Sequence, residues 1–180
     1  VRRKVAMKVM LPNVSDNPIH IKRFLEEAQV TGQLEHPNIV PVHDIGIDEE
    51  SKIYFTMKMV QGEDLDAIIS KISHGDEEYQ KKYSLGTLLQ MFMKICDGIG
   101  YAHSKGVLHR DLKPENVMVG AFGEVMVMDW GLAKVLGRDD IQSGESAPSS
   151  LDTAIASQTM EGQVMGTPSY MSPEQALGKI

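Results

Sequence analysis

The chain has 180 residues, of which 42% are hydrophobic and 24% are charged, with a formal net charge of −7. This composition is typical of a globular protein with one domain or two small lobes, and the acidic balance disfavours nucleic acid as a partner, because phosphate binding needs a basic surface. No apolar run has the length of a membrane-spanning helix, and the N-terminal residues lack the apolar core of a signal peptide, so a cytoplasmic location is expected.

The first strand is predicted in "VRRKVAMKVML", where apolar side chains fall at alternate positions. This is the period of a β-strand, and it leaves Ala6 and Lys8 together on the opposite face. Residues 36–47 and 52–60 have the pattern of two further strands, joined by an acidic turn at residues 48–51. The N-terminal part of the chain therefore predicts a small sheet.

A helix is predicted between the first two of these strands, within residues 15–36. Apolar side chains recur there near helical spacing, Asp16 or Asn17 can act as the N-cap, and Pro18 suits the first turn. A second and better buried helix is expected over residues 84–105, where a long apolar stripe ends near Gly106.

Two features of the remaining sequence carry no obvious chemistry. The single cysteine, Cys96, lies on the apolar stripe of the second helix, so a packing role is favoured over a reactive one. Residues 137–163 contain few large apolar side chains and cannot bury enough surface to offset the entropy lost on ordering, so a mobile loop is expected. No internal repeat is present.

Four motifs follow one another in a fixed order: "VAMK" at residues 5–8, "HRDLKPEN" at residues 109–116, "DWG" at residues 129–131 and "GTPSYMSPE" at residues 166–174. A lone "DWG" carries no information, but the ordered set is specific because each motif supplies a different part of one reaction. The set resembles the motifs of bacterial eukaryotic-like serine/threonine protein kinases, and the resemblance covers essentially the whole chain.

The resemblance implies an α+β, two-lobed protein-kinase-like fold that is truncated at both ends. Residues 1–60 would form a partial N-lobe and residues 61–180 a partial C-lobe. The glycine-rich phosphate loop would precede Val1, and the remaining C-lobe helices would follow Ile180, so the segment by itself is expected to be weakly active or inactive. Glu174 would then lack its usual arginine partner and lie buried and unpaired, which is costly.

The resemblance also implies catalytic roles. Asp111 would accept the proton of the substrate hydroxyl, and Lys113 would steady the transferred phosphate; a lysine at this place is similar to the serine/threonine branch of the family. Lys8 would hold the α- and β-phosphates of ATP and pair with Glu27. Thr167 would bind Asp111 and Lys113 and not carry phosphate.

The expected cofactors are ATP and Mg²⁺. Asn116 and Asp129 would supply oxygen ligands to the metal, and Trp130 stands where the family usually has phenylalanine, so altered packing is expected without loss of the Asp129 ligand. The nucleotide would contact the following residues: Ala6, Lys8, Met57 as gatekeeper, the backbone of Lys58 and Val60, Asp64 at the ribose, and Met118. Met57 and Met118 could equally be core residues, and Lys8 and Glu27 taken alone would be read as surface charges.

Regulation is suggested by Arg110, because an arginine beside the catalytic aspartate resembles kinases that are switched by phosphorylation of the activation loop. Thr159 is the first candidate for autophosphorylation, followed by Ser157 and Thr153, although each could be an ordinary loop hydroxyl. Expected partners are proteins with Ser or Thr acceptors, and a second copy of the chain is a candidate partner for autophosphorylation.

Two other functions remain open at this stage. A pseudokinase would keep the fold as a binding or scaffold module without transferring phosphate. A small-molecule phosphotransferase would share the aspartates but would not need "GTPSYMSPE", a segment that positions peptides, and is therefore the least favoured reading.

Overall fold

The computed structural model describes residues 3–11, 17–136 and 165–179. The predicted loop at residues 137–163, with Thr153, Ser157 and Thr159, lies outside the described residues, as does Asp16, one of the two N-cap candidates.

The three strands predicted near the N-terminus form one antiparallel sheet. They are β1 (Val5–Val9), β2 (Val42–Ile47) and β3 (Ile53–Lys58), in the order β1-β3-β2. The register pairs Ala6 with Met57 and Lys8 with Phe55, so Lys8 lies on an edge strand next to the central strand β3.

Helix α2 (Pro18–Gln33) packs beside this sheet, and the rings of Phe24 and Phe55 are 5.0 Å apart. The helix begins where the sequence predicts. Asn17 is the N-cap, its side chain accepts a hydrogen bond from the Ile19 N–H at 3.0 Å, and Pro18 follows in the first turn. Proline suits this position because the first N–H groups of a helix have no partner within it.

The rest of the described chain is mainly helical, with short strands. In chain order its elements are β4 (Gly62–Asp64), α3 (Leu65–Ser73), α4 (Glu77–Lys82), α5 (Leu85–Ser104), β5 (Val107–Leu108), the 3-10 helix η1 (Pro114–Asn116), β6 (Val117–Gly120), β7 (Val125–Val127), β8 (Lys134–Val135), the 3-10 helix η3 (Pro168–Tyr170) and α6 (Pro173–Ala176). Strands β4, β6 and β7 form a second antiparallel sheet, and β5 pairs with β8.

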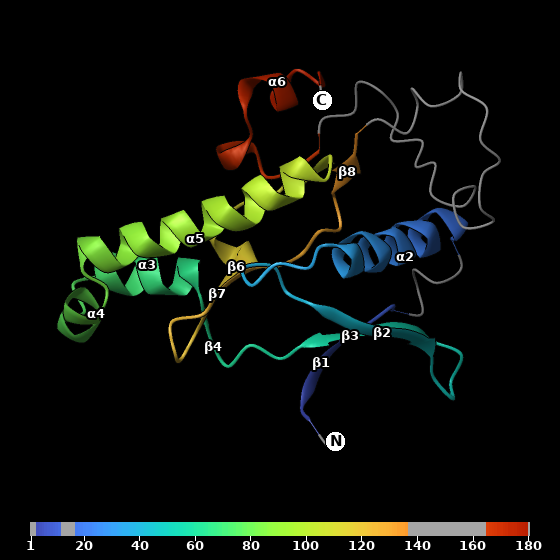
Figure 1. Cartoon of the computed structure of the whole chain (residues 1–180), viewed down its shortest axis with the longest axis horizontal. Helices are drawn as coiled ribbons and strands as arrows, with labels where there is room; N and C mark the ends of the chain where they lie inside the picture. Colours follow the sequence, from blue (N-terminus) through green and yellow to red (C-terminus); the bar gives the residue numbers. More distant parts are fainter. Residues whose placement is uncertain (1–2, 12–16, 137–164, 180) are drawn as a thin grey trace.

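A short extended segment connects the two parts. The N–H of Val127 donates to the carbonyl of Asn38 at 2.8 Å, and the N–H of Val40 donates to the carbonyl of Val127 at 3.1 Å. Ile39, between them, is buried in the core together with Trp130. Figure 1 shows β6 and β7 between α5 and the β1–β3 sheet, so the end of β7 reaches the junction of the two parts.

The prediction that the apolar stripe of α5 is buried is only partly correct. Met91, Ile95 and Ala102 are buried. Leu85 and the residues that follow it at helical spacing as far as Cys96 are exposed. The stripe is therefore wider than the face of α5 that packs on β5 and β7. The predicted packing role of Cys96 is therefore wrong.

Within the described residues, no helix is both long and apolar enough to cross a membrane.

Candidate active site

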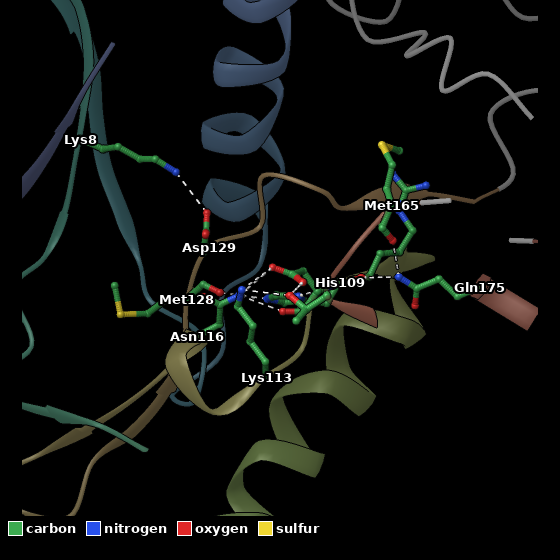
Figure 2. Close-up of polar contacts among 11 residues, drawn as sticks. Lys8, His109, Lys113, Asn116, Met128, Asp129, Met165 and Gln175 are labelled. Carbon is green, nitrogen blue, oxygen red and sulfur yellow. Dashed lines mark hydrogen bonds and ion pairs between the residues drawn. The ribbon is translucent and has the colours of Figure 1, made fainter. Parts of the chain in front are cut away.

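The first cluster of charges lies where β1, α2 and the end of β7 meet. The Lys8 Nζ lies 2.6 Å from Glu27 Oε1 and 3.2 Å from Asp129 Oδ1, although 19 and 121 residues of sequence separate these pairs. Glu27 is 9% exposed, whereas Lys8 and Asp129 are 40% and 52% exposed at their side chains. Glu27 thus fixes the ammonium from the inner side, and Asp129 stays open to solvent. Figure 2 shows the contact between Lys8 and Asp129.

The pair keeps both groups charged through opposing effects. Burial by itself would lower the pKa of Lys8, but Glu27 and Asp129 more than offset this effect and raise it. Burial raises the pKa of Glu27, and the ammonium of Lys8 limits that rise. The result is a lysine that stays cationic beside an exposed carboxylate.

The second cluster joins residues 109–116, the predicted catalytic loop, to the far end of the chain. The Thr167 hydroxyl donates to Asp111 Oδ1 at 2.7 Å, and Lys113 Nζ donates to Thr167 Oγ1 at 3.0 Å. The Asn116 Nδ2 donates to the carbonyl of Asp111 at 2.8 Å and to its Oδ2 at 3.3 Å. Asp111 therefore accepts hydrogen bonds from Thr167 and Asn116, and Thr167 bridges it to Lys113 as the sequence predicts.

This environment keeps Asp111 ionised. Burial would raise the pKa of Asp111, but the hydrogen bond from Thr167 and the charge of Lys113 outweigh burial and hold the pKa below its usual value. A carboxylate in this state can accept a hydrogen bond from a hydroxyl and orient it, which is the first requirement for a general base.

The buried His109 stabilises the loop that carries Asp111, a role that the sequence analysis did not assign. It is 3% exposed, its Nε2 lies 2.9 Å from the carbonyl of Met128, and its Nδ1 accepts from the Asp111 N–H at 3.3 Å. One nitrogen donates and the other accepts, which requires the neutral ring, and burial accordingly lowers the pKa of His109. The sequence signal that could have indicated this role was the position of His109 in the "HRD" motif.

Trp130 fills the space beside His109, with ring centroids 4.6 Å apart. It is 1% exposed, and its Nε1 has no hydrogen-bond partner among the described residues. Asp129, next to it, has a backbone φ of 57°, in the left-handed region, and its carboxylate still faces Lys8. The larger ring is thus accommodated without moving Asp129 away from the cluster.

The proposed metal ligands lie on neighbouring segments. The N–H of Met128 donates to the backbone carbonyl of Asn116 at 2.8 Å, which holds the residue before Asp129 against η1. The side-chain nitrogen of Asn116 is used by Asp111, so its amide oxygen is the atom left for a cation. Within the described residues, no cluster of three or more His, Cys, Asp or Glu side chains is placed to bind a metal.

A cavity of about 240 Å³ opens between the two parts of the molecule. Lys8, Glu27 and Asp129 line it on the charged side, and Val40, Phe55 and Met57 line it on the apolar side. Ala6 is the register partner of Met57 on β1, so the predicted gatekeeper and the predicted lid over the nucleotide base are cross-strand neighbours.

The segment after β3 limits how a base could be recognised. The N–H of Lys58 donates to the carbonyl of Pro41 at 3.0 Å, so the group that Lys58 can offer to a base is its carbonyl.

Met118 lies opposite Asp64 in the pairing of β6 with β4. The Asp64 Oδ1 accepts from the Ala67 N–H at 2.7 Å and caps α3, so one of its oxygens is already engaged. Val60 follows β3 and is half-buried.

The expectation for Glu174 is wrong in one respect. Glu174 is exposed and lies in the first turn of α6, where its own backbone N–H and Ser172 lower the pKa of its carboxyl. Negative charge is favoured near a helix N-terminus, and solvent reaches this group, so the penalty for a buried, unpaired charge does not apply here.

Comparison with known proteins identifies the family. The model of the protein kinase domain matches residues 1–179, and the chain therefore belongs to the protein kinase family.

Several relatives carry the name serine/threonine-protein kinase PknD. The protein from Chlamydia muridarum is 42% identical over 184 residues, that from Protochlamydia amoebophila is 41% identical over 184 residues, and that from Chlamydia pneumoniae is 37% identical over 179 residues. Each comparison covers 98% of this chain but only 18% to 20% of the relative, so the chain spans about a fifth of the length of these proteins.

Proposed function

We propose that the protein transfers the γ-phosphoryl group of ATP to serine and threonine hydroxyls of proteins. The observation that carries the proposal is the position of Asp111. It accepts a hydrogen bond from Thr167 and forms an ion pair with Lys113 at 3.4 Å, while Asn116 links the same loop to the segment that carries Asp129. Family membership and the names of the relatives support the same reading. In this proposal the N-terminal lobe of the kinase domain ends near Val60.

In this proposal the protein positions the reactants and supplies charge. The Lys8 ammonium, fixed by Glu27, binds phosphate oxygens of ATP. Asp111 accepts a hydrogen bond from the acceptor hydroxyl, orients it toward the phosphorus and takes its proton as the new O–P bond forms. Lys113 lies on the same side and neutralises charge on the group in transit. ADP leaves with the former bridging oxygen.

The donor set also fits Mg²⁺. This ion usually takes one or two protein carboxylates and completes its shell with water and phosphate, without an all-protein cage. Asp129 offers an exposed carboxylate and Asn116 an amide oxygen, so these two residues would hold the metal. When bound, the metal supplies neutralisation of phosphate charge.

Phosphate transfer by the full-length protein tests the proposal. Labelled ATP with Mg²⁺ and a generic protein substrate should give labelled Ser and Thr in the wild type and in Asp97→Asn, a control at an exposed position on α5. Asp111→Asn should lower the rate at least a hundredfold with ATP affinity unchanged within about twofold. Nucleotide binding without transfer in the wild type would favour the scaffold function instead.

We include autophosphorylation of the activation loop in the proposal. The Arg110 Nε donates to the carbonyl of Leu132 at 2.6 Å, and burial together with the neighbouring Arg23 lowers the pKa of Arg110. Neither arginine forms an ion pair with an acidic side chain among the described residues, so in this proposal their charges are available to bind a phosphate dianion.

The acceptor position and the need for a second copy can be tested together. Active protein is mixed with a size-tagged Asp111→Asn variant, and phosphosites are mapped on the inactive partner. Phosphate at Thr159, Ser157 or Thr153 of that partner would support transfer between two copies. Phosphate restricted to the active chain would contradict transfer in trans.

A further inference from the structure

Gln175 directly follows the "GTPSYMSPE" motif, and the sequence analysis assigns it no chemistry. Gln175 follows Glu174 in α6, and its side-chain Nε2 donates to two backbone carbonyls. It lies 2.5 Å from the carbonyl oxygen of Arg110 and 2.6 Å from that of Met165 (Figure 2). A primary amide has two N–H groups, so both are used in this arrangement.

The first of these carbonyls belongs to the peptide that leads into Asp111. Arg110 has a φ of 65°, which is uncommon for a residue other than glycine and must be maintained by its surroundings. Gln175 binds the carbonyl oxygen of the Arg110–Asp111 peptide, and His109 Nδ1 accepts from the N–H of the same peptide at 3.3 Å. Both polar atoms of this peptide are therefore engaged, which sets the direction in which the Asp111 side chain leaves the loop.

The second carbonyl lies two residues before Thr167, the partner of Asp111. Gly166, in between, has a φ of +124°, and a Cβ at this position would lie 2.6 Å from both the Arg110 carbonyl oxygen and Gln175 Nε2. The backbone at Gly166 thus passes so close to the catalytic loop that no side chain fits. One amide group links the chain just before Asp111 to the chain just before Thr167, and these two residues meet at 2.7 Å.

Ser172 fixes Gln175 in turn. Its side-chain oxygen caps α6 by accepting from the Gln175 N–H at 3.3 Å. Ser172 is the N-cap of α6, and an alanine at this position could not accept this hydrogen bond. Ser172 therefore anchors the backbone from which the Gln175 side chain extends.

We propose that Gln175 is a positioning residue for phosphoryl transfer, which links the end of the activation segment (residues 129–174) to the strained turn at Arg110 and thereby fixes Asp111 against Thr167. This inference rests on the proposed kinase function. Gln175 does not line the cavity that contains Lys8 and Met57, so its loss should affect turnover and leave ATP binding unchanged.

Steady-state kinetics of the full-length protein test the proposal. Gln175→Met keeps the size of the side chain and removes both donors, and Gln175→Glu keeps the shape but places carboxylate oxygens against two carbonyls. We expect kcat to fall at least tenfold in the methionine variant and further in the glutamate variant, with KM for ATP unchanged within twofold. Ser172→Ala should give a smaller fall. If Gln175 only filled space, kcat would instead fall less in the glutamate variant, which keeps the shape of the side chain, than in the methionine variant.

Gln80→Met is the matched control. The Gln80 Nε2 also donates to a backbone carbonyl, that of Ile72 at 3.2 Å, but on α4 and outside the catalytic loop and activation segment. Its kcat should stay within twofold of the wild type. Rates are divided by the number of sites that bind a non-hydrolysable ATP analogue, so that a variant with fewer folded molecules is not mistaken for a slower enzyme.

Hydrogen–deuterium exchange supplies a readout that does not need activity. In Gln175→Met, peptides from residues 108–116 and 165–171 should exchange faster than in the wild type, and peptides from α3 should not change. Unchanged exchange, or an unchanged kcat per binding site, would overturn the inference. A wild type that transfers no phosphate would overturn the proposed function, and the catalytic part of this inference with it, whatever the exchange shows.

Discussion

Removing Lys8 should destabilise the fold through the partner that it leaves behind. Lys8 Nζ lies 2.6 Å from Glu27 Oε1, and Glu27 is 9% exposed, so Lys8→Met leaves a buried carboxylate without its cation. Breaking such a pair typically costs about 3–5 kcal/mol. Glu27 can escape part of this cost by binding a proton. Its ordinary pKa is 4.5, and neutralising it at pH 7 costs about 3.4 kcal/mol at 1.36 kcal/mol per pH unit, which is an upper limit.

We therefore expect Lys8→Met to lower the free energy of unfolding by about 2–3 kcal/mol at pH 7. Glu27→Gln should cost only about 1 kcal/mol, because Lys8 is 40% exposed and keeps Asp129 at 3.2 Å. The double variant should be more stable than Lys8→Met, since it contains no uncompensated buried charge. In Lys8→Met the buried Glu27 has a raised pKa in the folded state, so the defect should shrink as the pH falls from 7 toward 4.5.

The assay is denaturant-dependent hydrogen exchange of α2 and α5 peptides in the full-length protein. Lys81→Met is the matched control, because Lys81 pairs with Glu77 at 3.6 Å on the surface, with both side chains more than 75% exposed. Such a pair contributes about 0–1 kcal/mol. A double variant less stable than Lys8→Met, or a Lys8→Met protein as stable as the control, would refute the reasoning.

Three further predictions follow from the same site. Thr167→Val should lower kcat about tenfold or more with ATP affinity unchanged, because a hydrogen bond to a charged group contributes about 1.5–3 kcal/mol; Thr87→Val, half-buried in the first turn of α5, serves as control, and equal rates for both would contradict the bridging role. Burial lowers the pKa of His109 below 6.5, so the unfolded chain binds the proton first as the pH falls. The free energy of unfolding should therefore decrease below pH 6.5, by at most about 1.36 kcal/mol per pH unit. His109→Tyr should reduce this slope in exchange experiments, and an unchanged slope would exclude His109 as its source. Trp130→Phe should change stability by about 1 kcal/mol or less, because the lost contacts are offset by removal of an unpartnered N–H, and a loss of about 3 kcal/mol would show that the indole nitrogen is not a liability.

The sequence predicts the elements well where the signal is local. Alternation of apolar residues predicts β1, and Asn17 with Pro18 predicts the start of α2, because strand period and helix capping depend on neighbours a few residues apart. The prediction fails at Cys96. A hydrophobic stripe shows that a helix has an apolar side but not how wide the contacting surface is, and on α5 that surface covers only part of the stripe.

The sequence by itself predicted the chemistry that we propose for this protein, because the residue types and order of "HRDLKPEN", "DWG" and "GTPSYMSPE" are typical of one reaction. Only the tertiary structure decided which groups meet. Lys8 reaches Asp129 across 121 residues because β1 and the end of β7 are brought to one junction, and Gln175 reaches Arg110 across 65 residues because Gly166 allows the backbones to approach. Such contacts depend on the packing of whole elements, and no local pattern of residues encodes a distance of that kind.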